Sequence, residues 1–320
     1  MGPAEEKMAV AKLSVYSNSA LVVLKVIVGL MMGSVAVLSE AIHSGIDLVA
    51  ALIARYSVKM SGEPADKDHM YGHGKYENLS GMIEGSLIFV AAAWIIYEAL
   101  GKLFDPQSID VIYAGLAVMG ISAVLNFMVS RRLTKVAKKT DSLALEADAY
   151  HLTTDVWTSV GVFIALALIW FTGIELLDPL VALMVAAFII HAAYDITTRS
   201  THGLLDRSLP EAEIKLIEGV IRGRGTQVLN YHRLRARKMG SERQIDVHMV
   251  IPRNLSVKDG HDLVSNLERE IKKELPNSVI VVHIEPCDAN CQRCKMMPVA
   301  PLSATADGQP NGSSECRPKD

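Results

Sequence analysis

Long apolar runs separated by short polar connections dominate the first two thirds of the chain. Each run is close to the roughly 20 helical residues that the hydrocarbon core of a bilayer requires. The pattern therefore predicts six membrane-spanning helices, over residues 12–32, 35–58, 80–101, 111–130, 144–171 and 179–197. We expect Pro179 to be the first residue of the last helix, with Asp178 as its N-cap.

Basic residues gather in alternate connections between these runs. The connection after the second run carries Arg55, Lys59, Lys67 and Lys75, whereas the connections on the opposite side hold only Lys102. Further basic residues follow the fourth run. By the positive-inside rule, we expect the basic connections, both termini and everything after the sixth run to face the cytoplasm.

A soluble pattern begins near residue 207. An amphipathic helix, two alternating segments, a second helix and a β-rich run follow one another. This order predicts a compact α+β domain of ferredoxin-like or metallochaperone-like type, with its helices on one face of a small sheet. The expected organisation is a six-helix transmembrane bundle (1–206), a cytoplasmic α+β domain (207–288) and a disordered tail (289–320) rich in Pro, Gly and Ser.

Composition agrees with a membrane protein that carries a soluble domain. Of the 320 residues, 50% are hydrophobic, and the mean hydropathy is +0.25. The formal net charge of −3 gives no global basic character. We therefore set nucleic acid aside as a partner.

Two of the predicted membrane helices carry ionisable residues at the same spacing. His43 and Asp47 lie in one run, and His151 and Asp155 lie in another. The four-residue spacing puts each pair on one helical face. Four such ligands can close a tetrahedral metal site, and two carboxylates neutralise a dication at membrane depth. The alternatives are a structural polar contact between helices and an intramembrane proton relay.

Three weaker patterns also suit metal ions. The connection "ADKDHMYGHGK" holds Asp66, His69 and His73, with Asp68 as a substitute for Asp66, although it also reads as a solvated connection. The cytoplasmic domain holds four histidines and a nearby carboxylate, which suit a metal cluster or a solvated face; they are His232, His248, His261, His283 and Glu285. Cys287, Cys291 and Cys294 could capture a soft ion or be ordinary tail cysteines, and we give them no part in the mechanism.

Two further carboxylates lie within the predicted spans. Glu84 is early in the third run, where it could simply face water near the cytoplasmic end. Asp148 precedes His151 by about one helical turn. It could support the metal ligands from outside or place charge at a cytoplasmic entrance.

Taken together, these residues resemble the cation diffusion facilitator family of bacterial zinc and divalent-metal exporters. The resemblance rests on the two His-x-x-x-Asp pairs, the histidine-bearing loop and the histidines of the final domain, and it covers residues 10 to 288. It implies a homodimer in membrane lipid that exchanges cytoplasmic metal for protons by alternating access. The two imidazoles and two carboxylates favour Zn²⁺ as cargo, with Cd²⁺, Co²⁺, Fe²⁺ and Ni²⁺ as further candidates.

The resemblance also implies roles for the remaining candidates. Zinc would bind the loop residues Asp66, His69 and His73. A structural or regulatory binuclear zinc site would be formed by His232, His248, His261, His283 and Glu285. Lys75 and Asp206 would form a salt bridge between protomers. The short loops suggest a multi-pass protein of a prokaryotic inner (plasma) membrane.

Two other function classes compete with the transporter. A membrane-embedded metalloenzyme would need an open metal position and a general base, as in the motif H-E-x-x-H, which the sequence lacks. A membrane-tethered metal sensor would leave the two intramembrane pairs unexplained. The sequence therefore predicts a transporter and not an enzyme.

Overall fold

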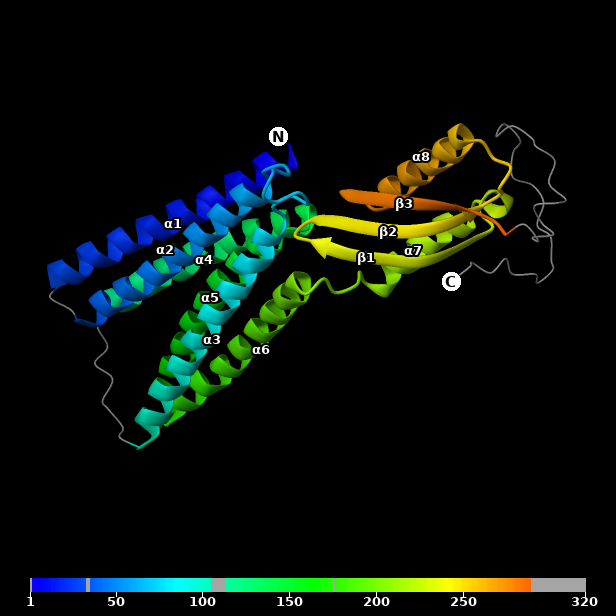
Figure 1. Cartoon of the computed structure of the whole chain (residues 1–320). Coiled ribbons are helices and arrows are strands. Elements are labelled where there is room, and N and C mark those ends of the chain that lie inside the picture. The colour runs from blue at the N-terminus through cyan, green and yellow to red at the C-terminus, as the bar shows by residue number, and fades with distance from the viewer. Residues whose placement is uncertain (1, 33–34, 105–112, 175, 289–320) are drawn as a thin grey trace. The chain divides into compact units, whose positions relative to one another are not determined.

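The computed structural model describes residues 2–32, 35–104, 113–174 and 176–288 (Figure 1). The chain divides into two compact units between Leu205 and Asp206. The tail over 289–320, for which we expect disorder, lies outside the described residues.

The first unit consists of long helices, as the apolar runs predict. They are α1 (Pro3–Met32), α2 (Val35–Ser61), α3 (Lys75–Phe104), α4 (Tyr113–Thr140), α5 (Leu143–Thr172) and α6 (Leu177–Leu204). Within the described residues, α1, α2, α3, α5 and α6 are long and apolar enough to cross a membrane. The predicted fourth span begins at residue 111, outside the described part, and α4 covers the rest of it.

The start of α6 corrects one sequence expectation. The N-cap is Leu176, and Asp178 lies in the first helical turn instead of capping it. Proline is tolerated anywhere in a first turn, where its missing N–H costs nothing, so Pro179 does not fix the first residue. The Asp178 carboxylate accepts a hydrogen bond from Lys102 of α3 at 3.0 Å.

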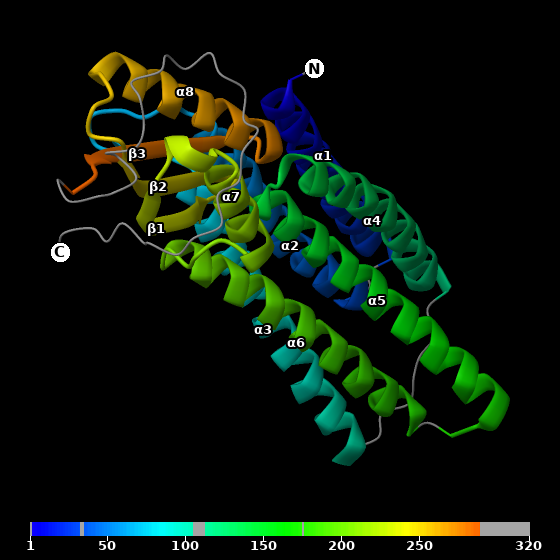
Figure 2. The same cartoon turned by 90° about the vertical axis from the view of Figure 1, so that its right-hand side faces the viewer.

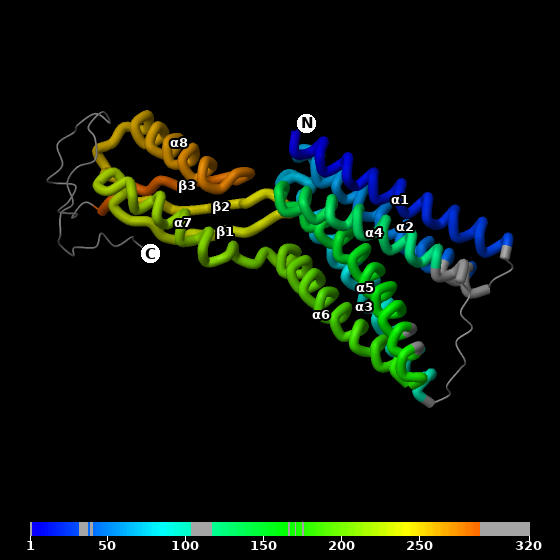
Figure 3. Tube along the Cα trace, turned by 180° about the vertical axis from the view of Figure 1, so that it is seen from behind, coloured from blue at the N-terminus to red at the C-terminus, as the bar shows by residue number. Residues whose placement is uncertain are grey.

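Helices α3 and α6 lie side by side (Figures 2 and 3) and approach closely at two glycines. A Cβ atom added at Gly85 would fall 2.2 Å from Oγ1 of Thr197, and one at Gly81 would fall 2.4 Å from Oγ of Ser200. Small residues four apart let two membrane helices approach closely, because dispersion contacts between backbones then replace the hydrophobic effect that lipid does not supply. The sequence "GMIEG" thus sets the contact between the two helices.

A buried ion pair ties together the helix ends near the start of α3. Nζ of Lys7, on α1, lies 2.8 Å from Oε1 of Glu77, whose side chain is fully buried. Ser61 of α2 donates to the same carboxylate at 3.1 Å, and Ser142, directly before α5, donates at 2.7 Å. The charge of Glu77 is therefore compensated, and α1, α2, α3 and α5 meet at one polar point.

The second unit is the expected α+β domain. It comprises α7 (Glu211–Arg222), a 3₁₀ turn (Gly225–Gln227), β1 (Asn230–Met239), β2 (Glu242–Ile251), α8 (Val257–Glu274) and β3 (Ser278–Pro286). The strand order is β1-β2-β3, with β2 antiparallel to β1 and parallel to β3.

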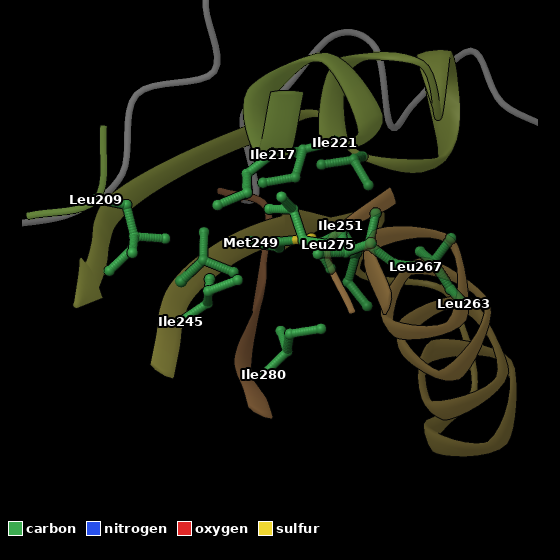
Figure 4. Close-up of a cluster of buried hydrophobic side chains, with 14 residues drawn as sticks. Leu209, Ile217, Ile221, Ile245, Met249, Ile251, Leu263, Leu267, Leu275 and Ile280 are labelled. Carbon is green, nitrogen blue, oxygen red and sulfur yellow. The ribbon is translucent and has the colours of Figure 1, made fainter. Parts of the chain in front are cut away.

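The core of this unit lies between the sheet and its two helices. Alternate residues of β2, such as Ile245 and Met249, form one buried cluster with Ile217 of α7 and Leu267 of α8 (Figure 4). Because strand side chains alternate between faces, the intervening residues of β2, Asp246 and His248 among them, lie on the opposite face of the sheet. The two helices therefore cover one face of the sheet, and polar side chains lie on the other face.

Candidate metal sites

The two intramembrane pairs come together between α2 and α5. Nε2 of His151 lies 3.0 Å from Oδ1 of Asp47, in a contact where both side chains are buried. Nε2 of His43 lies 4.0 Å from Oδ1 of Asp47 and 3.9 Å from Oδ1 of Asp155. The structure thus places His43, Asp47 and Asp155 around one point, with His151 in contact with Asp47; these four residues are hereafter called the tetrad.

The spacing within the tetrad suits a tetrahedral ion. Ligand atoms of His43, Asp47 and Asp155 all lie within 4.8 Å of one another. A tetrahedral zinc with bonds of about 2.0–2.1 Å holds its ligand atoms roughly 3.3 Å apart. The three contacts between a histidine nitrogen and a carboxylate oxygen run from 3.0 to 4.0 Å, which is close to that spacing. Closing a four-ligand shell also requires His151 to move toward His43 and Asp155.

Two polar neighbours of the tetrad were missed by the sequence analysis. Asn126 of α4 donates from Nδ2 to Oδ2 of Asp155 at 3.3 Å, which orients that carboxylate from outside. Lys25 of α1 is buried and donates to the hydroxyl of Ser44 at 2.7 Å, beside His43 in sequence. A lone lysine inside an apolar run is itself a sign of function in a membrane helix and could have drawn attention to this helix.

The loop between α2 and α3 gathers its three predicted ligands. Oδ1 of Asp66 lies 3.4 Å from Nδ1 of His69, and Oδ2 of Asp66 lies 3.3 Å from Nε2 of His73. Nδ1 of His73 is 3.2 Å from the carbonyl oxygen of Pro64, which leaves Nε2 as the free lone pair when Nδ1 carries the proton. The loop therefore brings two imidazole nitrogens and a carboxylate close enough together to bind one metal ion.

The backbone of this loop fixes the charge of Asp66. The backbone N–H of His69 donates to its carboxylate at 2.6 Å, and that of Asp68 donates at 2.9 Å. These hydrogen bonds, chiefly the one from His69, lower the pKa of Asp66. Asp68 contributes its backbone to the group, and Asp66 supplies the carboxylate.

In the second unit, strand register aligns three histidines across the sheet. His232 of β1 pairs with His248 of β2, which pairs in turn with His283 of β3. Glu285 lies two residues beyond His283 and therefore on the same face. Its carboxylate lies 2.7 Å from Nδ1 of His248, 3.6 Å from Nε2 of His232 and 3.8 Å from Nε2 of His283.

The electrostatics of this row favour a cation. The hydrogen bond from His248 lowers the pKa of Glu285, and the charges of His232 and His283 act in the same direction. His261 lies exposed on α8, and within the described residues no contact joins it to the row. The structure therefore assembles four of the five residues predicted for this site.

Three remaining candidates are placed apart from these clusters. Lys75 begins α3 and donates to the carbonyl oxygen of Leu204 at 3.3 Å, while Asp206 accepts from Arg237 at 2.9 Å. Cys287 is disulfide-bonded and buried against Leu229 and Val250. Its predicted companions, Cys291 and Cys294, lie outside the described residues.

Comparison with known proteins matches both units. The family model for the cation efflux transmembrane domain matches residues 11–205, and that for the cytoplasmic domain of cation efflux proteins matches residues 209–287. "Uncharacterized transporter sll1263" of Synechocystis sp. is 38% identical over 256 residues, which cover 80% of this chain and 83% of that protein.

Two further relatives were found. Cation-efflux pump FieF of Pectobacterium atrosepticum is 31% identical over 269 residues, which cover 84% of this chain and 89% of the pump. Among solved structures, the metal-bound C-terminal domain of the CzcD transporter from Thermotoga maritima matches at 26% identity and a TM-score of 0.22, covering 24% of this chain and 94% of that domain.

Proposed function

This chain belongs to the cation efflux family of membrane transporters, and we propose that it exports Zn²⁺ in exchange for protons. Family membership makes it a multi-pass transporter of divalent cations and not an enzyme. The choice of zinc, the coupling to protons and alternating access are the parts that we propose.

The meeting of the tetrad between α2 and α5 carries this proposal. Two aspartates balance the charge of a dication, which lowers the cost of holding it at membrane depth. Two imidazole nitrogens with two carboxylate oxygens in four-coordinate geometry suit zinc, whereas Mg²⁺ and Mn²⁺ ask for more oxygens in an octahedral shell. Cd²⁺, Co²⁺, Fe²⁺ and Ni²⁺ are secondary candidate cargoes.

The contact between His151 and Asp47 supports exchange for protons. A hydrogen bond across the 3.0 Å between these two acceptor atoms requires a proton, carried either by the imidazole or by the carboxyl group. A metal ion binds through the same lone pairs. A neutral imidazole can shift its own proton to Nδ1 when a metal takes Nε2, so loading the metal releases a proton when the pair holds one proton more than that. Protonation of the pair on the other side of the membrane then favours release of the metal.

The cytoplasmic sites fit a supporting role in a homodimer. We propose that the row formed by His232, His248, His283 and Glu285 binds zinc together with His261, and that this site stabilises or senses closure of the dimer. The loop residues Asp66, His69 and His73 would hold a further zinc. Lys75 and Asp206 would pair between protomers. The basic connections favour cytoplasmic termini in a prokaryotic inner membrane.

Proteoliposomes with an acidic lumen test the function directly. We expect external Zn²⁺ to enter vesicles that contain the protein while a luminal dye reports alkalinisation, because protons leave as metal enters. Vesicles without protein and vesicles treated with a protonophore are the controls. Uptake that ignores the proton gradient would overturn proton coupling, and zinc binding without uptake would favour a sensor.

Replacing His248 with alanine should weaken only the cytoplasmic site. This residue contacts Glu285 at 2.7 Å, so its loss should reduce zinc affinity there by at least about tenfold. Maximal flux through the tetrad should stay near the wild-type value. Calorimetric titration in a His151→Ala background isolates the cytoplasmic sites, and His261→Ala is the matched comparison. A larger loss in His261→Ala than in His248→Ala would contradict the arrangement.

A further inference from the structure

Two buried carboxylates lie close to the tetrad and have no place in it. Glu84 of α3 is 0% exposed, and Asp148 of α5 is 1% exposed. The carboxylate of Glu84 is near enough to Asp148 and to His151 for their charges to interact. Asp148 precedes His151 by three residues, which is about 4.5 Å along the helix axis toward the α5 N-terminus. By the topology proposed above, that is the cytoplasmic side.

Neither carboxylate is satisfied by the protein. Both oxygens of Asp148 and Oε2 of Glu84 are buried without a hydrogen-bond partner, and Oε1 of Glu84 accepts only from Ser80, at 2.7 Å. Among the described residues, no lysine or arginine forms an ion pair with either carboxylate. Unpaired buried carboxylates are costly, so each is compensated either by a bound proton or by a positive ligand that displaces it.

A second set of unsatisfied groups comes from α1. The hydroxyl of Ser14 is fully buried and lies close enough to Asp148 to interact with its carboxylate, but it makes no hydrogen bond of normal geometry. Asn18, one turn further along the same face, is buried with an unsatisfied amide nitrogen. Buried neutral groups of this kind are normally paired with protein or water. Their vacant hydrogen-bonding capacity points to a polar occupant between α1, α3 and α5.

We propose that Glu84 and Asp148 form a way station for the divalent cation on its path from the cytoplasm to the tetrad. This inference rests on the proposed transport function and extends it. The donors are carboxylate and hydroxyl oxygens, which suit a cation that still keeps some of its water. Such a set discriminates little between metals, so selection for zinc falls to the imidazoles of the tetrad one turn further in.

Steady-state transport in proteoliposomes tests the way station. Glu84→Gln and Asp148→Asn remove one negative charge each with little change in shape. Each should raise the KM for Zn²⁺ at least about tenfold, because a charged path concentrates its ion by that order, and each should leave the maximal rate within about twofold. Glu98 is an exposed carboxylate on α3, the helix that also carries Glu84, and Glu98→Gln should change neither the KM nor the maximal rate.

Equilibrium binding separates a way station from a structural support. Co²⁺ bound to the tetrad should give the visible absorption of a four-coordinate ion. Glu84→Gln and Asp148→Asn should keep the intensity of this absorption and the midpoint of the Co²⁺ titration. Glu84→Asp, which keeps the negative charge, should have a KM for Zn²⁺ close to that of the wild-type protein. An unchanged KM, or loss of the Co²⁺ signal together with transport, would overturn the way station. The proposed function itself fails only when the wild-type protein shows no proton-coupled flux.

Discussion

Replacing His151 with alanine is expected to reduce zinc-driven proton exchange at least about 100-fold, since loss of a residue merely outside a metal site already costs 10–100-fold. His151 is buried and supplies the nitrogen that lies 3.0 Å from Asp47. Under the proposed function, its removal deletes a zinc ligand and one of the two groups that share the exchangeable proton. Initial rates of zinc uptake and luminal alkalinisation measure both losses.

The chain offers a matched control for this variant. His191 lies in α6 and is exposed, and no contact joins it to the tetrad among the described residues. His191→Ala removes the same ring from a membrane helix and should transport zinc at the wild-type rate. Substantial proton-coupled flux in His151→Ala would contradict the assignment of the transport site.

The second large effect concerns stability. Lys7→Met should lower the free energy of unfolding of the membrane unit by about 3–5 kcal/mol, because it leaves the buried carboxylate of Glu77 without its cation. The hydrogen bonds from Ser61 and Ser142 persist but do not neutralise the charge. Thermal unfolding of the detergent-solubilised protein, followed by the loss of helical circular dichroism, measures the change.

Two further variants separate charge from packing. Lys7→Met combined with Glu77→Gln removes both charges and should recover most of the lost stability, because the amide oxygen can accept from one serine hydroxyl while its NH₂ group donates to the other. Lys12→Met changes an exposed lysine on the same helix and should shift stability by no more than about 0.5 kcal/mol. Equal destabilisation by the double and single variants would show that the ion pair is not the cause.

The helices of the membrane unit were largely predictable from the sequence. Apolar runs locate them because lipid offers no partner for a free backbone group. Their ends were not predictable in the same way: α3 begins at Lys75, five residues before the predicted span, because polar residues of its first turns such as Glu77 are buried and satisfied within the protein. The N-cap predicted at Asp178 was wrong because a first-turn proline does not fix the first residue.

For the sites, the spacing of residues along the sequence predicted which side chains take part but not how close they come in space. The repeated His-x-x-x-Asp pattern identified the residues of the tetrad, but their approach to within 3.0–4.0 Å depends on how α2 packs against α5. The alignment of His232, His248 and His283 depends on strand register, which alternation alone leaves open. Asn126 was missed because one amide in a long helix carries no periodic signal.

The close contact between α3 and α6 has a mechanical consequence. With Gly81 and Gly85 seated against Ser200 and Thr197, sliding one helix along the other by a single residue would drive bulkier side chains into the space that glycine leaves. We therefore expect α3 and α6 to move together. If the protein works by alternating access, as proposed, the motion would then occur where α2 and α5 contact this pair of helices.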